Sequence, residues 1–113
     1  MRLIDGGVLE RVPTRQVKDM GADVVVAVDA LGQRLGKEKM PGTVGILLEA
    51  IEMMDFFRTQ VRRKENADII DFWLEPDLGD MSQYSLKQIK EACEKGYELG
   101  KANVDAIKKA LEE

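Results

Sequence analysis

Apolar residues are concentrated in blocks along the chain, and their spacing separates candidate strands from candidate helices. The clearest strand candidate is residues 22–29, in which β-branched and apolar residues occupy both faces. Such a strand is typical of the middle of a parallel sheet that helices cover on both sides. Two shorter apolar runs, at residues 2–4 and 68–74, are further candidates, and Pro76 ends the second because proline cannot donate to a ladder. The pattern therefore predicts about three strands.

Between the first two strand candidates, the sequence carries the signals of a short helix. Pro13 suits the first turn of a helix, where its missing N–H costs nothing. We expect the helix to continue to about Met20, because Gly21 then occupies the position of a C-terminal cap.

Two longer helices are predicted at residues 43–64 and 85–111. The first is apolar over most of its circumference, which indicates burial on more than one side or contact with a partner. Its apolar positions form two stripes, which are Val44, Leu47, Leu48, Ile51 and Met54, and Ile46, Ala50, Met53, Phe57 and Val61. The second helix has one apolar stripe with spacings of three and four, made of Leu86, Ile89, Cys93, Tyr97, Gly100, Val104, Ile107 and Leu111.

The order strand, helix, strand favours an α/β fold with a mostly parallel sheet, built here from about three strands and three helices. The 113 residues suffice for one modest domain. A parallel sheet usually has more strands, and its edges need covering. The pattern therefore predicts a chain that is incomplete or that depends on a partner.

Composition excludes several classes of function. With 17 basic and 21 acidic residues the net charge is −4, so the basic footprint of a nucleic-acid-binding protein is missing. The absence of histidine excludes Ser-His-Asp and Cys-His catalytic sets and any His-ligated zinc or haem. The single cysteine excludes an internal disulfide. The longest apolar run, residues 24–28, is far shorter than the ~20 residues of a membrane-spanning helix, so a reducing, cytoplasmic location is expected.

The sharpest local feature is the sequence Asp5-Gly6-Gly7, which follows the first strand candidate. In open α/β sheets, catalytic groups gather at the carboxyl ends of strands. Two glycines leave the carboxylate uncrowded, so that a hydroxyl group could approach it. The alternative interpretation is an ordinary Asp-Gly turn between two apolar stretches.

The longer stretch around Asp5 resembles the C-terminal catalytic block of patatin-like phospholipases, which are serine lipid acyl hydrolases. The resemblance is carried by Leu3-Ile4-Asp5-Gly6-Gly7-Val8-Leu9, by Val12-Pro13, and by Met20-Gly21-Ala22-Asp23-Val24-Val25-Val26-Ala27-Val28-Asp29. It implies a three-layer α/β/α fold, of which residues 1–113 are the C-terminal portion of a single domain. It also implies a Ser-Asp dyad in which Asp5 is the general base, supported by Gly6 and Gly7, with no metal and no cofactor. The missing histidine agrees with such a dyad.

One departure from the family pattern is decisive for activity. The family's nucleophile lies in a Gly-x-Ser-x-Gly elbow, and a glycine-rich loop supplies the oxyanion hole; neither occurs in this sequence. Its serines are Ser82 and Ser85, and Ser85 suits a helix N-cap with Gln88 three residues later. The resemblance thus implies a chain that carries half of the dyad and is inactive alone. Its partners would be the missing N-terminal region or a second copy, a lipid or other ester substrate, and a membrane surface contacted peripherally.

Several other residues have a structural interpretation that we prefer to a functional one. Cys93 suits core packing rather than a reactive thiol. Gly96 and Gly100 suit close packing on the sheet rather than dimerisation in a membrane. The basic residues 58–64 indicate a solvated helix end rather than a site for anionic headgroups. The acidic residues 68–80 lack the calcium-loop pattern, so no metal site is expected.

Two functions from different classes follow. The first is a segment of a lipid acyl hydrolase that contributes Asp5, part of the central sheet and its covering helices. The second is a non-enzymatic α/β association module, which would act through exposed sheet edges or through the apolar helix 43–64.

Overall fold

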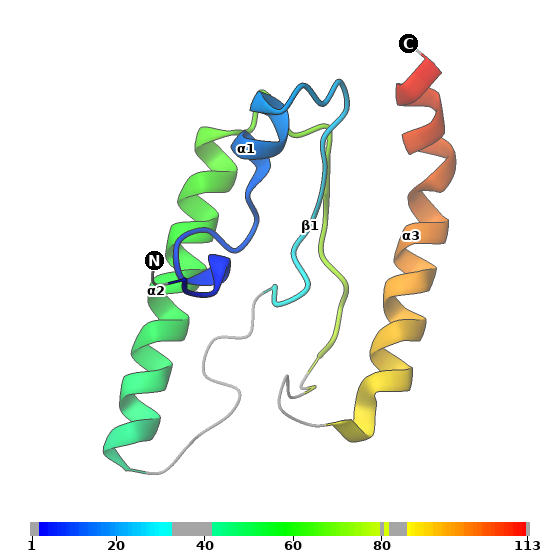
Figure 1. Ribbon diagram of the computed structural model, residues 1–113. Coiled ribbons are helices and arrows are strands. Elements are labelled where there is room, and N and C mark those ends of the chain that lie inside the picture. Colours follow the sequence, from blue (N-terminus) through cyan, green and yellow to red (C-terminus); the bar gives the residue numbers. More distant parts are fainter. Residues whose placement is uncertain (1–2, 33–41, 80, 82–85, 113) are drawn as a thin grey trace.

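The chain forms a mixed α/β structure, as the sequence predicts. The computed structural model describes residues 3–32, 42–79, 81 and 86–112 (Figure 1). Its helices are α1 (Thr14–Asp19), α2 (Thr43–Glu65) and α3 (Ile89–Glu112), with short 3-10 turns at Gly6–Val8 and Leu86–Gln88. Its strands are β1 (Val26–Val28) and β2 (Phe72–Leu74), which pair in parallel.

Strand β1, helix α2 and strand β2 make up one βαβ unit. The strands pair in the register Val26 with Phe72, Ala27 with Trp73 and Val28 with Leu74. Asp71, just before β2, fixes the start of this pairing. Its backbone N–H donates to the Val25 carbonyl at 3.1 Å, and its carboxylate accepts from the Val25 N–H at 2.8 Å.

The described residues contain two strands rather than the predicted three. Leu3 and Ile4, in the first predicted strand, are exposed and lie in no strand, because no segment among the described residues pairs with them to form a ladder. The predicted strand 68–74 is shortened from its start by turns that follow α2, in which the Ile69 N–H donates to the Asn66 carbonyl at 3.0 Å. Since a strand extends only as far as its partner, the predicted strand 22–29 is reduced to β1.

The predicted helices are confirmed to within a few residues at each end. Helix α1 ends before Gly21, whose φ of +99° is a conformation that glycine adopts without the steric penalty of a Cβ. The Gly21 N–H donates to the Lys18 carbonyl at 2.9 Å, as a helix cap requires. Residue 85, the predicted N-cap of the last helix, lies outside the described residues.

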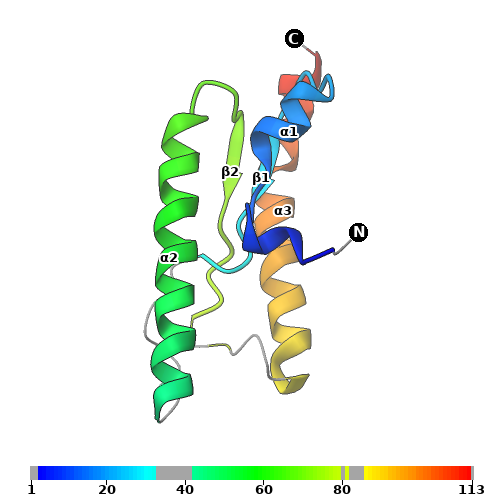
Figure 2. The same cartoon turned by 60° about the vertical axis from the view of Figure 1, so that its left-hand side comes forward.

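Helices α2 and α3 lie on opposite sides of the two-stranded sheet, and α1 lies beside the C-terminal end of α2 (Figures 1 and 2). Val25 and Ala27 are buried, with 2% and 4% of their surface exposed. The contact between α1 and α2 is polar: the Asn66 amide donates to the Thr14 hydroxyl at 3.3 Å, and both residues are buried.

Helix α2 turns its polar face inward. Its buried positions are Gly45 and Thr59, and Asp55 on the same face is partly buried. Both apolar stripes are largely exposed, with Val44 at 69% and Phe57 at 57%. Of the two possibilities for this helix, burial on several sides within the chain is therefore wrong for the described structure, and contact with a partner stays a prediction.

The predicted apolar stripe of α3 is also exposed, except at Ile107, which is half-buried. Cys93 is exposed, which corrects the expectation that it packs in the core. A Cβ placed on Gly96 or Gly100 would meet nothing within 4 Å, so neither glycine permits a close approach to the sheet. The face of α3 that lies toward the rest of the molecule instead includes Lys95, whose ammonium donates to the Asp77 carbonyl at 2.8 Å. None of the described helices has an uncharged apolar stretch long enough to cross a membrane.

Candidate functional site

Asp5 lies at the start of a tight turn, and its own backbone holds its carboxylate. Its Oδ1 accepts a hydrogen bond from the Gly7 N–H at 2.8 Å, and its carbonyl accepts from the Val8 N–H at 3.1 Å. The residue is exposed, and Oδ2 has no hydrogen-bond partner in the described part of the chain. One oxygen is therefore fixed, and the other faces outward where it could accept a proton.

Gly7 lies close to the Asp5 carboxylate. A Cβ on Gly7 would lie 3.2 Å from Asp5 Oδ1, which is closer than a side chain is normally tolerated, whereas a Cβ on Gly6 would meet nothing within 4 Å. Gly7 thus allows the carboxylate to approach the backbone. No other segment approaches the position of a Cβ on Gly6, so the two glycines are not equivalent in this turn.

Arg58, in the middle of α2, holds the same turn from outside. Its Nη1 donates to the Val8 carbonyl at 2.7 Å, and its Nη2 lies 3.3 Å from the Gly7 carbonyl. The same Nη2 donates to Asp55 Oδ1 at 3.0 Å. The guanidinium therefore joins the backbone that follows Asp5 to a carboxylate one turn earlier on α2.

A second arginine extends these contacts to the end of β1. Arg11 donates from Nη1 to Asp55 at 2.7 Å and from Nη2 to Asp29 at 2.8 Å. The Asp29 side chain has 0% of its surface exposed, and its other oxygen accepts from the backbone N–H groups of Leu31 and Gly32. We call Arg11, Asp29, Asp55 and Arg58 the arginine–aspartate network.

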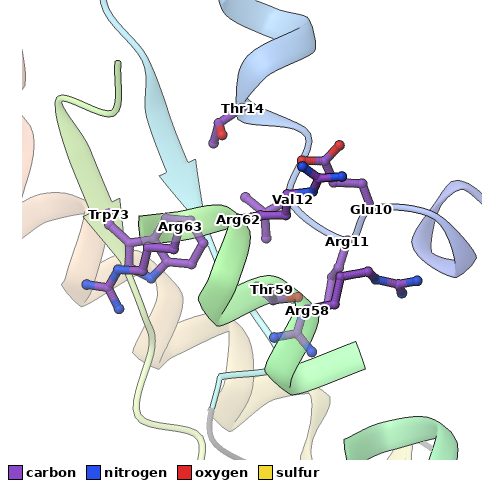
Figure 3. A pocket seen from close by; sticks show the side chains of 9 residues that line it. All are labelled: Glu10, Arg11, Val12, Thr14, Arg58, Thr59, Arg62, Arg63 and Trp73. Atoms are coloured by element: carbon purple, nitrogen blue, oxygen red, sulfur yellow. The ribbon is translucent and has the colours of Figure 1, made fainter. Parts of the chain in front are cut away.

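A shallow hollow lies beside the network, and Arg11, Arg58, Arg62 and Arg63 line it together with Glu10 (Figure 3). Although four arginines line it, each is neutralised by an acidic residue. The network holds two arginines and two aspartates, and the remaining two arginines each have their own partner. The hollow therefore has no excess of positive charge with which to attract an anion.

The two arginines in the last turn of α2 have acidic partners of their own. Arg62 pairs with Glu65 at 2.9 Å on its own helix. Arg63 pairs with Glu75 at 2.9 Å and lies over the ring of Trp73 at 4.8 Å, as Figure 3 shows for the two side chains. Ion pairing on the protein thus accounts for these cations, in agreement with a structural rather than a headgroup-binding interpretation.

The described acidic residues between 68 and 77 do not converge. Asp71 and Glu75 are engaged by the Val25 N–H and by Arg63, and Asp80 lies outside the described residues. Within the described ranges, no group of three or more acidic or cysteine side chains could hold a metal ion. Ser82 and Ser85 also lie outside these ranges, so the structure does not place either serine relative to Asp5.

Asp5, Gly6 and Gly7 were predicted as site residues from the sequence, whereas the arginine–aspartate network was not. Its members are distant in sequence, since 18 residues separate Arg11 from Asp29 and 44 separate Arg11 from Asp55. One signal was present: Asp29 directly follows the most apolar strand, where a carboxylate needs a partner.

No protein-family model matches this chain, and no solved structure matches it.

Proposed function

We propose that this chain contributes Asp5 as the general base of a Ser-Asp dyad in a patatin-like lipid acyl hydrolase. The observation that carries the proposal is the state of the Asp5 carboxylate. Asp5 is exposed, and the Gly7 N–H holds its Oδ1, while its Oδ2 has no hydrogen-bond partner among the described residues. The nucleophilic serine would come from a segment outside this sequence, because no Gly-x-Ser-x-Gly occurs in it.

The reaction would proceed in two halves. Asp5 takes the proton of the serine hydroxyl while the serine oxygen attacks the ester carbonyl, and the proton then passes to the departing alcohol. The product of this half is an acyl-enzyme. In the second half, Asp5 takes a proton from water, the hydroxide attacks the acyl group, and the proton returns to the serine as the acid leaves. Neither half requires a histidine, a metal or a cofactor.

The arrangement of α2 and α3 supports a larger three-layer α/β/α domain. A sheet of two parallel strands with helices on both sides is the pattern expected of part of such a domain (Figures 1 and 2). Further strands and helices would cover apolar side chains that are exposed here, including Leu47 at 61% and Met54 at 64%. The proposed enzyme is cytoplasmic and reaches its lipid substrate at the membrane surface.

The test is ester hydrolysis by the chain expressed together with the segment encoded upstream of Met1, where we expect the Gly-x-Ser-x-Gly elbow. Activity on a short-chain ester should require both parts, and Asp5→Asn should lower the rate at least ~100-fold, as loss of a general base does. Asp19→Asn is the matched control, because Asp19 is an exposed carboxylate at the end of α1. Hydrolysis at the unsubstituted rate by the Asp5→Asn protein would reject the proposal.

A second candidate function rests on the exposed stripes of α2. Helix α2 presents Leu47, Ile51 and Met54 on its surface, which is the expected state of an association module before it binds its partner. Sedimentation across a concentration series would detect self-association. Ile51→Glu should then dissociate the assembly, whereas Leu111→Glu, an equally drastic change on α3, should not. A monomer at all concentrations would argue against self-association through α2.

A further inference from the structure

We propose that Arg58 is a positioning residue that fixes the turn carrying Asp5 against helix α2. This inference rests on the proposed function, because positioning matters only if Asp5 is a base. Arg58 makes no contact with the Asp5 carboxylate. It acts through the carbonyls of Gly7 and Val8, to which its two Nη atoms donate at 3.3 and 2.7 Å.

The turn has little else to hold it in place. Apolar burial does not anchor it, since Leu3 is 79% exposed, Val8 56% and Leu9 70%. Its internal hydrogen bonds shape the turn but do not attach it to the rest of the chain. The bonds from Arg58 attach it to α2, a helix of 23 residues. Arg11, which follows the turn in sequence, provides the second attachment through Asp55 and Asp29.

The geometry requires an arginine at this position. A guanidinium is a planar fork that donates in several fixed directions, whereas an ammonium is a point charge on a flexible stem. Arg58 uses both ends of its fork for backbone carbonyls and also donates to Asp55 Oδ1 at 3.0 Å. Asp55 in turn accepts from Arg11 at 2.7 Å, so the fork is itself held in orientation.

A loosely held base lowers the rate of the reaction, because proton transfer depends on the alignment of the base with the proton that it takes. Catalytic groups need to be held within about 0.5 Å of the productive geometry, and a misplacement of about 1 Å can cost roughly 100-fold. Releasing the turn should therefore lower kcat of the assembled hydrolase by about 10- to 100-fold. KM should stay within about twofold, because Arg58 does not touch the substrate in this arrangement.

The first experiment needs no activity and uses the full 113-residue chain. Amide hydrogen exchange of Gly7 and Val8, whose N–H groups bond to Asp5, reports directly on the turn. We expect Arg58→Gln to accelerate this exchange by about tenfold or more, following the increased opening of a segment that has lost its attachment. The matched control is Arg62→Gln, one turn further along α2, because among the described residues Arg62 pairs with Glu65 alone, on its own helix. Equal exchange in the two variants would overturn the proposal.

Arg58→Lys keeps the experiment decisive if Arg58→Gln fails to fold. Lysine retains the positive charge beside Asp55 but cannot reproduce the fork, so exchange at Gly7 should still rise. Exchange unchanged from the original chain in a folded Arg58→Lys protein would overturn the proposal.

The second experiment separates the positioning role from the proposed function. In the assembled hydrolase, Arg58→Gln should lower kcat and leave KM within about twofold, while Asp5→Asn should lower the rate at least ~100-fold. If Asp5→Asn is inactive and Arg58→Gln affects neither exchange nor kcat, the positioning role is wrong and the proposed function stands. If Arg58→Gln accelerates exchange but Asp5→Asn hydrolyses esters normally, the proposed function fails and Arg58 has no base to position.

Discussion

Replacing Arg11 by methionine removes the cation beside a fully buried carboxylate. The Asp29 side chain has no exposed surface and lies 2.8 Å from Arg11 Nη2. Removing one partner of a buried ion pair typically costs about 3–5 kcal/mol, because the other charge is left uncompensated. Asp29 keeps its two backbone N–H donors, so we expect the lower end, about 3 kcal/mol. That is a large share of the ~5–15 kcal/mol by which domains are usually stable.

Urea denaturation measures this loss, and the fluorescence of the chain's one tryptophan, Trp73, provides the signal. With a slope near 1.5 kcal/mol/M for a protein of this size, a loss of about 3 kcal/mol lowers the midpoint by roughly 2 M. Arg62→Met is the control, because its pair with Glu65 is about half exposed. An exposed pair contributes at most ~1 kcal/mol, so the control should unfold close to the original midpoint.

A double-mutant cycle identifies the source of the effect. If Arg11 stabilises the fold through Asp29, then Arg11→Met and Asp29→Asn should be non-additive by more than about 1 kcal/mol, as expected for groups in direct contact. A stability loss in Arg11→Met no larger than that in Arg62→Met would refute this role of Arg11. Independent, additive effects of Arg11→Met and Asp29→Asn would refute it as well, because the contact between the two side chains would then contribute nothing.

Two further predictions concern other parts of the chain. Gly21→Ala should lower the free energy of unfolding by about 1–2 kcal/mol, because the residue adopts a φ of +99° that an L side chain resists. Gly100→Ala should raise the free energy of unfolding by about 0.5–1 kcal/mol, since a Cβ there meets nothing within 4 Å and alanine favours a helix. Thermal unfolding of both proteins would show whether the two substitutions change stability in opposite directions. Arg63→Gln should change the emission of Trp73, whose ring it covers at 4.8 Å and whose N–H donates to the shared partner Glu75 at 2.6 Å. Emission equal to that of the original chain would show that the ring and the cation are not in contact in solution.

Periodicity predicted the helices because helix formation depends on local signals. The cap at Gly21 and the apolar stripes of residues 43–64 each depend on residues that are close together in the sequence. Helices α1 and α2 form where those signals predict them. Which face of α2 turns inward was not predictable in the same way. The inner face contains Asp55 and Thr59, since Asp55 bonds to arginines from two parts of the chain. A hydrophobic pattern cannot indicate a face chosen by ion pairs.

The candidate site shows the same division between local and distant signals. The sequence Asp5-Gly6-Gly7 predicted a tight turn with an accessible carboxylate, and the structure has that turn, with Gly7 bonded to Asp5. Arg58 lies about fifty residues away in sequence, and nothing near Asp5 predicts it. The distant partner could be found only after α2 and the turn had been placed side by side.

The attachment of Asp71 to Val25 has a consequence for how the two strands align. A parallel pair with only three matched positions offers few ladder bonds by which to distinguish the correct alignment from one shifted by a residue. Such a shift would turn Ala27, which is buried, toward the opposite face. Asp71 binds both the N–H and the carbonyl of Val25, across 46 residues of chain. A slipped alignment would lose both bonds together, so this one aspartate selects the register that the short ladder alone could not.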